Sequence, residues 1–236
     1  MMKRLLLIIG FTACVGALAF ILITKVAEPS SIKPALPIHE IGMWLIGFHV
    51  EKKTPSRQWV AHHFCHQLRP DLMQCILYDQ NTLDAKMTGI EYIIPMEAFQ
   101  RLSKEEQQYW HPHNFEILSG QLTVPAASNE LAVLADKMNS YGKAFHMWNA
   151  GVFEQEDEIY PIGEPRLGWS FNHVHEPKLG MIEHTYDPMD ISVEQKKEER
   201  TTLISKAKPQ CGVKAIAHKF KGTSQPLDGV KTKKDC

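Results

Sequence analysis

The segment Trp59-Val-Ala-His-His-Phe-Cys-His-Gln-Leu68 is followed by Arg69-Pro70-Asp71 and then by Leu72-Met-Gln-Cys-Ile-Leu-Tyr78. The first segment is extended in character, and the last is an apolar run that favours β structure. Arg-Pro-Asp between them is a typical turn sequence. We therefore predict a β-hairpin, in which a three-residue loop at 69–71 pairs Leu68 with Leu72.

This register has a consequence for two cysteines of the hairpin. It places Cys65 directly opposite Cys75, and directly opposed residues have Cβ atoms about 4.5–5.5 Å apart, close to the range of a disulfide. The pair is a candidate disulfide if the domain folds in an oxidising compartment. Two small buried thiols are the alternative.

The segments on either side of the hairpin mix strand and helix signals. Ser103 and Glu106 form a capping box, which predicts that a helix breaks and restarts at Ser103. No internal repeat is present. We predict an α+β fold with a mainly antiparallel sheet of short strands and hairpins and two or three helices. The expected strands are residues 90–94, 115–118, 121–124, 145–148 and 167–171, and the expected helices are residues 97–110 and 129–141.

Histidine is concentrated around the hairpin, since seven of the 12 histidines fall between His49 and His146. On a strand, His62 and His66 share one face, while His63 shares the other with Cys65. Neutral imidazoles, often with a carboxylate, are the usual ligands of zinc and iron. Histidines that pack or form hydrogen bonds without a metal are the alternative. The candidate ligands of zinc or iron are His62, His66, His111, His113 and His146.

The N-terminus carries the strongest single signal. Residues 5–24 hold no charge, and Lys3, Arg4 and Lys25 flank them. Twenty helical residues span about 30 Å, the thickness of the hydrocarbon core of a bilayer. Residues 1–25 are therefore predicted to be one transmembrane helix that anchors the chain, with the body on the outer, periplasmic or extracytoplasmic side. A cleaved signal peptide and a lipoprotein modified at Cys14 are the alternatives.

The rest of the chain divides by composition into three further parts. Residues 26–38 hold three prolines and predict a stiff linker; residues 39–190 form the expected domain. Residues 191–236 carry 11 Lys and Arg against 5 Asp and Glu and few apolar residues, which predicts a disordered tail. The overall net charge of −1 argues against a basic nucleic-acid binder, so no nucleic-acid partner is expected.

An ordered series of motifs resembles the oil-body-associated protein family. The resemblance covers roughly residues 45–175 and implies a link to lipid surfaces, with no established biochemical activity. The predicted membrane span and the lysine-rich tail depart from the plant seed proteins of that family. The motifs are His62-His63-Phe64-Cys65, Gln74-Cys75-Ile76-Leu77-Tyr78-Asp79, Gly89-Ile90-Glu91-Tyr92-Ile93-Ile94, Leu102-Ser103-Lys104-Glu105-Glu106, Trp110-His111, Phe115-Glu116, Ser119-Gly120, Tyr141-Gly142-Lys143, His146, Trp148, Gly163-Glu164-Pro165 and Ser170-Phe171.

Two functions compete on the sequence. Gly-x-Ser-x-Gly and phosphate-binding glycine loops are absent, so no catalytic residue is assigned. The leading hypothesis is a membrane-anchored, non-enzymatic binding or organising domain with the membrane, and a lipid surface, as its partner. The alternative is a metal-binding protein or metal-dependent enzyme that uses the histidine cluster.

Overall fold

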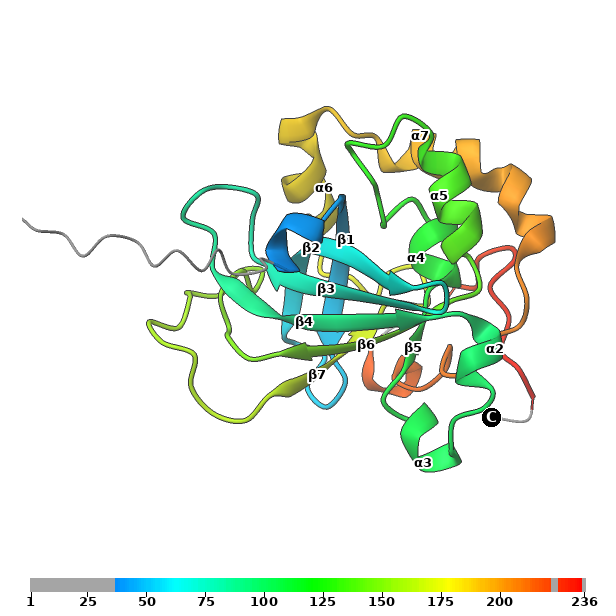
Figure 1. Ribbon diagram of the computed structural model, residues 1–236, viewed down its shortest axis with the longest axis horizontal. Helices are drawn as coiled ribbons and strands as arrows, with labels where there is room; N and C mark the ends of the chain where they lie inside the picture. The colour runs from blue at the N-terminus through cyan, green and yellow to red at the C-terminus, as the bar shows by residue number, and fades with distance from the viewer. Residues whose placement is uncertain (1–36, 222–224, 235–236) are drawn as a thin grey trace, which may run out of the picture. The chain divides into compact units, whose positions relative to one another are not determined.

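The computed structural model describes residues 37–221 and 225–234. These residues form an α+β domain, as predicted (Figure 1). Its strands are β1 (Met43–Glu51), β2 (Gln58–Arg69), β3 (Leu72–Tyr78), β4 (Met87–Ile94), β5 (His111–Pro112), β6 (Tyr141–His146) and β7 (Arg166–Ser170). Its α-helices are α2 (Met96–Phe99), α3 (Lys104–Gln107), α4 (Asn114–Leu118), α5 (Glu130–Lys137), α6 (Met181–Tyr186) and α7 (Val193–Glu199). The 3₁₀ helices are η1 (Pro37–Glu40), η2 (Asp187–Met189), η3 (Arg200–Lys206) and η4 (Ala217–Lys219).

The strands form one antiparallel sheet that closes on itself. The order is β4-β3-β2-β1-β7-β6-β5, and an additional pairing of β4 with β6 completes a six-stranded barrel. The short strand β5 pairs with the first residues of β6, Tyr141 and Gly142, whereas β7 pairs with the later residues 144–146 of β6. The mainly antiparallel sheet predicted from the sequence is therefore confirmed, and its closure is new.

Strand β1 was not predicted, although it lies between β2 and β7 at the centre of the sheet order. Its sequence, Met-Trp-Leu-Ile-Gly-Phe-His-Val-Glu, lacks the alternation of apolar and polar residues that marks a strand with one solvent face. The structure shows why, because one set of side chains enters the barrel while Ile46, Phe48 and Val50 pack in an outer cluster with α6. A strand covered on both faces reads as a continuous apolar run.

The predicted hairpin is present as β2 and β3, with a local difference at the turn. Arg69 pairs with Leu72, and a bulge at Leu68 absorbs the extra residue, so the predicted pairing of Leu68 with Leu72 is wrong. From Gln67 onward the predicted register is recovered, and Cys65 lies opposite Cys75. Their sulfur atoms form a disulfide with an S–S distance of 2.00 Å.

Two helix boundaries show how capping residues shape the domain. The Ser103 side chain accepts a hydrogen bond from the Glu106 amide at 3.2 Å, so the predicted break and restart is confirmed in α2 and α3. The strands expected at 115–118 and 121–124 do not pair as a hairpin, because residues 114–118 form α4. Gly120, with φ +86°, ends that helix rather than forming a hairpin turn.

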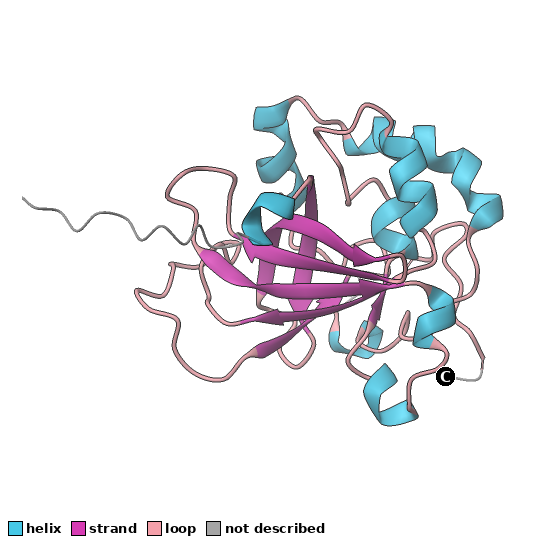
Figure 2. Ribbon diagram, in the orientation of Figure 1, coloured by secondary structure: helices cyan, strands magenta, loops and turns pink. Residues whose placement is uncertain are grey.

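Helices lie around the closed sheet rather than between its strands (Figure 2). Residues of α4, α5 and η3, including Leu118, Leu134 and Leu203, pack with inward-facing residues of the sheet such as Leu45 and Leu77. The outer faces of β1 and β7 pack against α6 in a second cluster. The helices therefore cover one end and one side of the barrel.

The prediction of a disordered tail over residues 191–236 is wrong for the part that is described, residues 191–221 and 225–234. Helix α7 and η3 occupy residues 193–206, and Arg200 and Leu203 are buried. Arg200 donates to the Ile117 carbonyl at 2.8 Å and pairs with Glu130 at 3.3 Å. The composition of the tail hides these contacts because their partners lie in α4 and α5.

The N-terminal predictions concern residues that the structure does not describe. The predicted span at residues 5–24, the alternative site Cys14 and nearly all of the predicted linker at 26–38 lie outside the described residues. Within residues 37–221 and 225–234, the helices are too short and too polar to cross a bilayer.

The disulfide generates a prediction about stability. Cys65 and Cys75 are ten residues apart, and cross-linking a loop of this length stabilises a fold by about 2–3 kcal/mol in the chain-entropy model. The double variant Cys65→Ser, Cys75→Ser should therefore lower the free energy of unfolding by about that amount in a urea titration. Peptide mapping of the native protein without reductant checks that the bond forms, and two free thiols would contradict it.

A second prediction concerns the tail. Leu203→Ala removes a side chain buried against α4 and α5, so the free energy of unfolding should fall by about 2–4 kcal/mol. Thr202→Ala, one residue away and exposed, should change it by less than about 0.5 kcal/mol. Equal effects of the two substitutions would show that the tail does not pack on the domain.

Candidate metal centre

A carboxylate lies inside the closed sheet. Glu91, on β4, is 1% exposed, and it is paired in register with Cys75 of β3 on one side and Ala144 of β6 on the other. Adjacent residues Ile90 and Tyr92 point the other way, since side chains alternate along a strand. An acidic residue at an inward position must find partners inside the protein, because burying an unpaired charge is costly.

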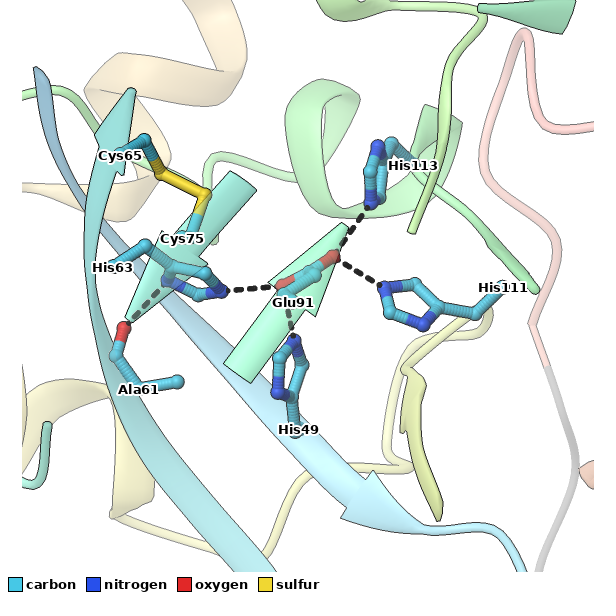
Figure 3. The surroundings of a disulfide bond; sticks show 8 residues. All are labelled: His49, Ala61, His63, Cys65, Cys75, Glu91, His111 and His113. Atoms are coloured by element: carbon cyan, nitrogen blue, oxygen red, sulfur yellow. Dashed lines mark hydrogen bonds and ion pairs between the residues drawn. A yellow bond between two sulfur atoms is a disulfide. The ribbon is translucent and has the colours of Figure 1, made fainter. Parts of the chain in front are cut away.

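Four imidazoles surround this carboxylate (Figure 3). The Nε2 atom of His63 lies 2.8 Å from Oε2 of Glu91, and that of His49 lies 3.5 Å from the same oxygen. On the other oxygen, Oε1, the Nε2 atoms of His111 and His113 lie at 3.3 and 3.4 Å. All four rings therefore present the same nitrogen to one carboxylate.

Three parts of the fold bring these rings together. His49 and His63 come from β1 and β2, whose inward positions face β4 across the barrel. His111 is on β5, and His113 precedes the first residue of α4. Strand β5 pairs His111 with Gly142 of β6, which places both rings at the end of the barrel that α4 covers.

Gly142 keeps space open for the cluster. A Cβ atom at this position would collide with Oε1 of Glu91 and would lie 2.6 Å from Nε2 of His111 and 2.7 Å from Nε2 of His113. The absence of a side chain there lets the carboxylate and two imidazoles meet. Gly142, just beyond the helix expected at 129–141, is therefore a strand residue of β6.

The outer nitrogens of two rings are held by acceptors. Nδ1 of His63 lies 2.9 Å from the carbonyl oxygen of Ala61, which accepts its proton. Nδ1 of His113 lies 2.7 Å from the hydroxyl of Ser140, and that hydroxyl donates to the Lys137 carbonyl at 2.8 Å. Since the hydroxyl proton is used on Lys137, the His113 ring donates to Ser140, and its Nε2 faces Glu91.

His111 is the exception in this cluster. Its side chain is fully buried, and neither ring nitrogen has a hydrogen-bond partner, because the 3.3 Å approach of Nε2 to Glu91 lacks hydrogen-bond alignment. Buried polar groups are satisfied in nearly all proteins, and an unsatisfied one costs about 1–3 kcal/mol. Among the described residues, nothing hydrogen-bonds to either nitrogen of His111, and a bound ion or water molecule would supply a partner.

A small cavity adjoins the cluster. It has a volume of about 20 Å³, and both polar side chains and apolar ones such as Leu45 and Leu122 line it; the polar ones include His49, His63, Glu91, His113 and Glu116. A cavity of about 10–15 Å³ is enough for one water-sized species. The site therefore has room for a single ion or water molecule.

The electrostatics favour an ionised Glu91 and neutral rings at His49, His113 and His146. Burial alone would raise the pKa of Glu91, but contacts with His111, His113 and His63 hold that pKa well below its ordinary value. Burial lowers the pKa of His49 well below its usual range, lowers that of His113, and lowers that of His146 to about 3. Neutral imidazole and ionised carboxylate are the protonation states that bind metal.

A second carboxyl group, Glu116 of α4, has the opposite behaviour. It is 3% exposed, and burial, followed by the charge of Glu91, raises the pKa of Glu116 well above its ordinary value. Its oxygen lies within 4.8 Å of nitrogens of His111 and His113. The cluster thus holds one ionised and one protonated carboxyl group.

The structure divides the five predicted ligands. His111 and His113 contact Glu91, and His146 lies in the next layer, where its Nε2 is 2.9 Å from Nδ1 of His49. His62 and His66 face the outside of β2: His62 accepts from the Trp44 indole at 3.3 Å, and His66 contacts the Glu40 carbonyl at 2.9 Å. They are not part of the cluster, because the inward face of β2 carries His63 and Cys65.

Three members of the cluster were missed on the sequence: His49, His63 and Glu91. His63 was known to share a face with Cys65, but alternation does not say which face of a strand is inside. Glu91 had a detectable signal, since it is the only charged residue in the strand segment 90–94. His49 lay in the strand that was not predicted.

Comparison with known proteins identifies relatives. Residues 35–204 match the model of the family described as "Protein of unknown function (DUF1264)". Oil body-associated protein 2A of Arabidopsis thaliana is 31% identical over 193 residues, which cover 79% of this chain and 75% of that protein. Oil body-associated protein 1B of the same plant is 28% identical over 80% of this chain and 76% of the relative. Oil body-associated protein 1A of Zea mays is 26% identical over 80% of this chain and 77% of the relative. No solved structure matches the chain.

Glu116 provides a pH-dependent prediction. Its carboxyl group stays protonated in the folded protein and ionises in the unfolded chain above pH 4.5, so folded wild-type protein loses stability as pH rises from about 4.5 toward the raised pKa. Glu116→Gln removes this loss. In urea titrations of chelator-treated protein, the free energy of unfolding of the variant should rise relative to that of the wild type by up to about 1.4 kcal/mol per pH unit between pH 5 and 7.5.

The exposed Glu154→Gln serves as the control for this series, and its difference from wild type should not grow with pH. A constant difference for Glu116→Gln would mean that Glu116 is ionised in the folded protein.

Proposed function

Because the chain belongs to the DUF1264 family together with the oil body-associated proteins, we propose that it is a membrane-attached binding protein that holds one transition-metal ion at Glu91. The ligands come from Glu91 and the inward-facing rings of His49, His63, His111 and His113. The metal assignment rests on the hydrogen-bond donors and lone pairs that face this buried carboxylate.

The contact between His63 and Glu91 requires a proton or a cation between the two side chains. Ala61 accepts the Nδ1 proton of His63, so a neutral His63 ring has a bare lone pair on Nε2. That lone pair lies 2.8 Å from an oxygen of a carboxylate whose pKa is held low. A proton shared between the two side chains, or a metal cation beside both atoms, would make this contact favourable.

His111 favours the metal cation. Neither nitrogen of its buried ring has a hydrogen-bond partner among the described residues. A proton added to His63 leaves this ring unsatisfied. A cation bound beside Glu91 would accept the Nε2 lone pair of His111 as well as those of His63 and His113, so one ion would satisfy several groups.

The chemistry of the donors indicates the kind of metal. Imidazole nitrogens with one carboxylate are typical of zinc and iron sites, and the nearby Cys65 and Cys75 are joined in a disulfide, so neither offers a thiol. Metal-binding histidines usually donate the other ring proton to a carbonyl or hydroxyl group, as His63 and His113 do here. The set therefore fits zinc or iron.

The size of the cavity supports binding rather than catalysis. About 20 Å³ accommodates the ion itself, whereas pockets for organic ligands are typically 300–1,000 Å³. The cluster is buried, so an organic substrate has no place beside the ion. The metal would hold β1, β2, β4 and the segment before α4 together.

Attachment to a membrane is the second part of the proposal. Residues 5–24 are uncharged and long enough to span a bilayer, and the relatives are named as oil body-associated. The charges before this segment favour a body on the outer side, where the Cys65–Cys75 bond would be stable. Residues 1–25 would be the anchor and 26–36 the connection to the domain. Lipidation at Cys14 would give the same attachment by another route.

Metal content tests the central claim. The full chain, purified in detergent without a His tag or chelator, should contain about one equivalent of zinc or iron by elemental analysis. Glu91→Gln and His111→Ala should each lower this content at least fivefold, because they remove ligands. His62→Ala and His66→Ala, on the outer face of the same sheet, should retain it.

A second measurement on the wild-type protein tests the centre without relying on variants that fold poorly. Wild-type protein stripped with a chelator should gain several degrees in melting temperature when zinc or ferrous iron is restored, since a ligand bound only to the folded state stabilises it. A folded wild-type chain that contains no metal and gains no stability from either ion would refute the proposed centre.

A further inference from the structure

Four large apolar side chains protrude from two loops at one end of the barrel. Leu83, in the loop at 79–86, is 110% exposed; Ile159, Tyr160 and Ile162, in the loop at 147–165, are 82%, 71% and 59% exposed. We call these four residues the apolar loop patch. Pro161 completes an exposed apolar run at 159–162. Such runs are rare on monomeric surfaces and usually mark a site of interaction.

The two loops are neighbours in the fold. Strand β4 starts between the end of β3 and the end of β6, so the loop before β4 and the loop after β6 leave the sheet side by side (Figure 1). An ion pair of 2.8 Å between Lys86 and Asp157 connects them. The patch is therefore formed by adjacent segments.

The longer loop is held so that its apolar side chains face outward. Trp148 donates from its indole to the Glu158 carbonyl at 2.8 Å, and Asn149 donates to the Glu158 carboxylate. The Gly151 amide donates to Asp157 at 2.9 Å. These bonds anchor the residues immediately before Ile159, which leaves residues 159–162 at the tip of an ordered loop.

The start of the described chain lies next to the patch. Ile38 and Leu83 line the same surface cavity of about 390 Å³. The 12 residues at 25–36 connect residue 24 to Pro37 and can reach at most about 47 Å. A domain tethered by so short a connection stays near the membrane, and the surface beside its tether is the one that meets lipid.

We infer that the apolar loop patch inserts into the bilayer that holds residues 5–24. This inference rests on the membrane attachment proposed above and adds the face of the domain that touches lipid. Tyrosine suits the interface between headgroups and hydrocarbon, while leucine and isoleucine enter the hydrocarbon itself.

The charges around the patch define the type of lipid. The loop at 147–165 carries five acidic residues and no basic one: Glu154, Glu156, Asp157, Glu158 and Glu164. An anionic surface would repel this loop, so the patch should prefer a zwitterionic lipid such as phosphatidylcholine.

A fluorescence experiment tests the contact with lipid. The full chain is reconstituted into phosphatidylcholine vesicles as Tyr160→Trp and, for the control, as Leu68→Trp; Leu68 is 48% exposed near the end of β2, at the opposite end of the barrel. Brominated phosphatidylcholine quenches tryptophan only on contact. The extra emission of Tyr160→Trp over wild type should fall at least twofold, and that of Leu68→Trp should stay unchanged.

Flotation of the same vesicles separates the two proposals. If both variants float and neither is quenched, attachment stands and the inferred face is wrong. If neither floats, attachment itself fails and the inference falls with it. Replacing half of the lipid by phosphatidylglycerol should weaken the quenching of Tyr160→Trp. Hydrogen exchange of residues 159–162 gives a further check. If their protection increases with protein concentration and not with lipid concentration, the patch contacts a second copy of the chain and the inference is overturned.

Discussion

The interior of the domain is organised around the burial of one carboxylate. Glu91 faces the inside of a six-stranded barrel, where its charge must be compensated within a space that few side chains share. Four imidazoles on three separate parts of the fold turn the same nitrogen toward it. A glycine at position 142 leaves the space that these groups occupy, because a Cβ atom there would collide with them. The closure of the sheet, the position of β5 and the start of α4 all depend on bringing these groups together.

Local features were the ones predictable from the sequence. The register of the hairpin follows from one turn and two short strands, so Cys65 could be placed opposite Cys75. The capping box at Ser103 likewise predicted the start of a helix from residues close in sequence. Properties set by distant parts of the chain were not predictable. Strand β1 is apolar on both faces because α6 covers it, and the tail is ordered because Arg200 reaches α4 and α5.

The candidate centre shows the same division. His111 and His113 could be found because they are two residues apart and share a face when extended. His62 and His66 were chosen over His63, since alternation separates the two faces of β2 without identifying the inner one. Only the closure of the sheet through β4 and β6 makes that choice, and it also turns Glu91 inward. A lone acid inside an apolar strand is the signal that deserves most weight in such sequences.

Closure of the sheet also bears on how copies of the protein behave toward one another. Each of the six strands of the barrel has a neighbour on both sides, so the described part of the chain offers no long unpaired strand edge. Exposed edges template β-pairing between molecules. Confinement to a surface raises local concentration by restricting diffusion to two dimensions, which would favour such polymerisation. A sheet without free edges lets many copies crowd together and remain separate.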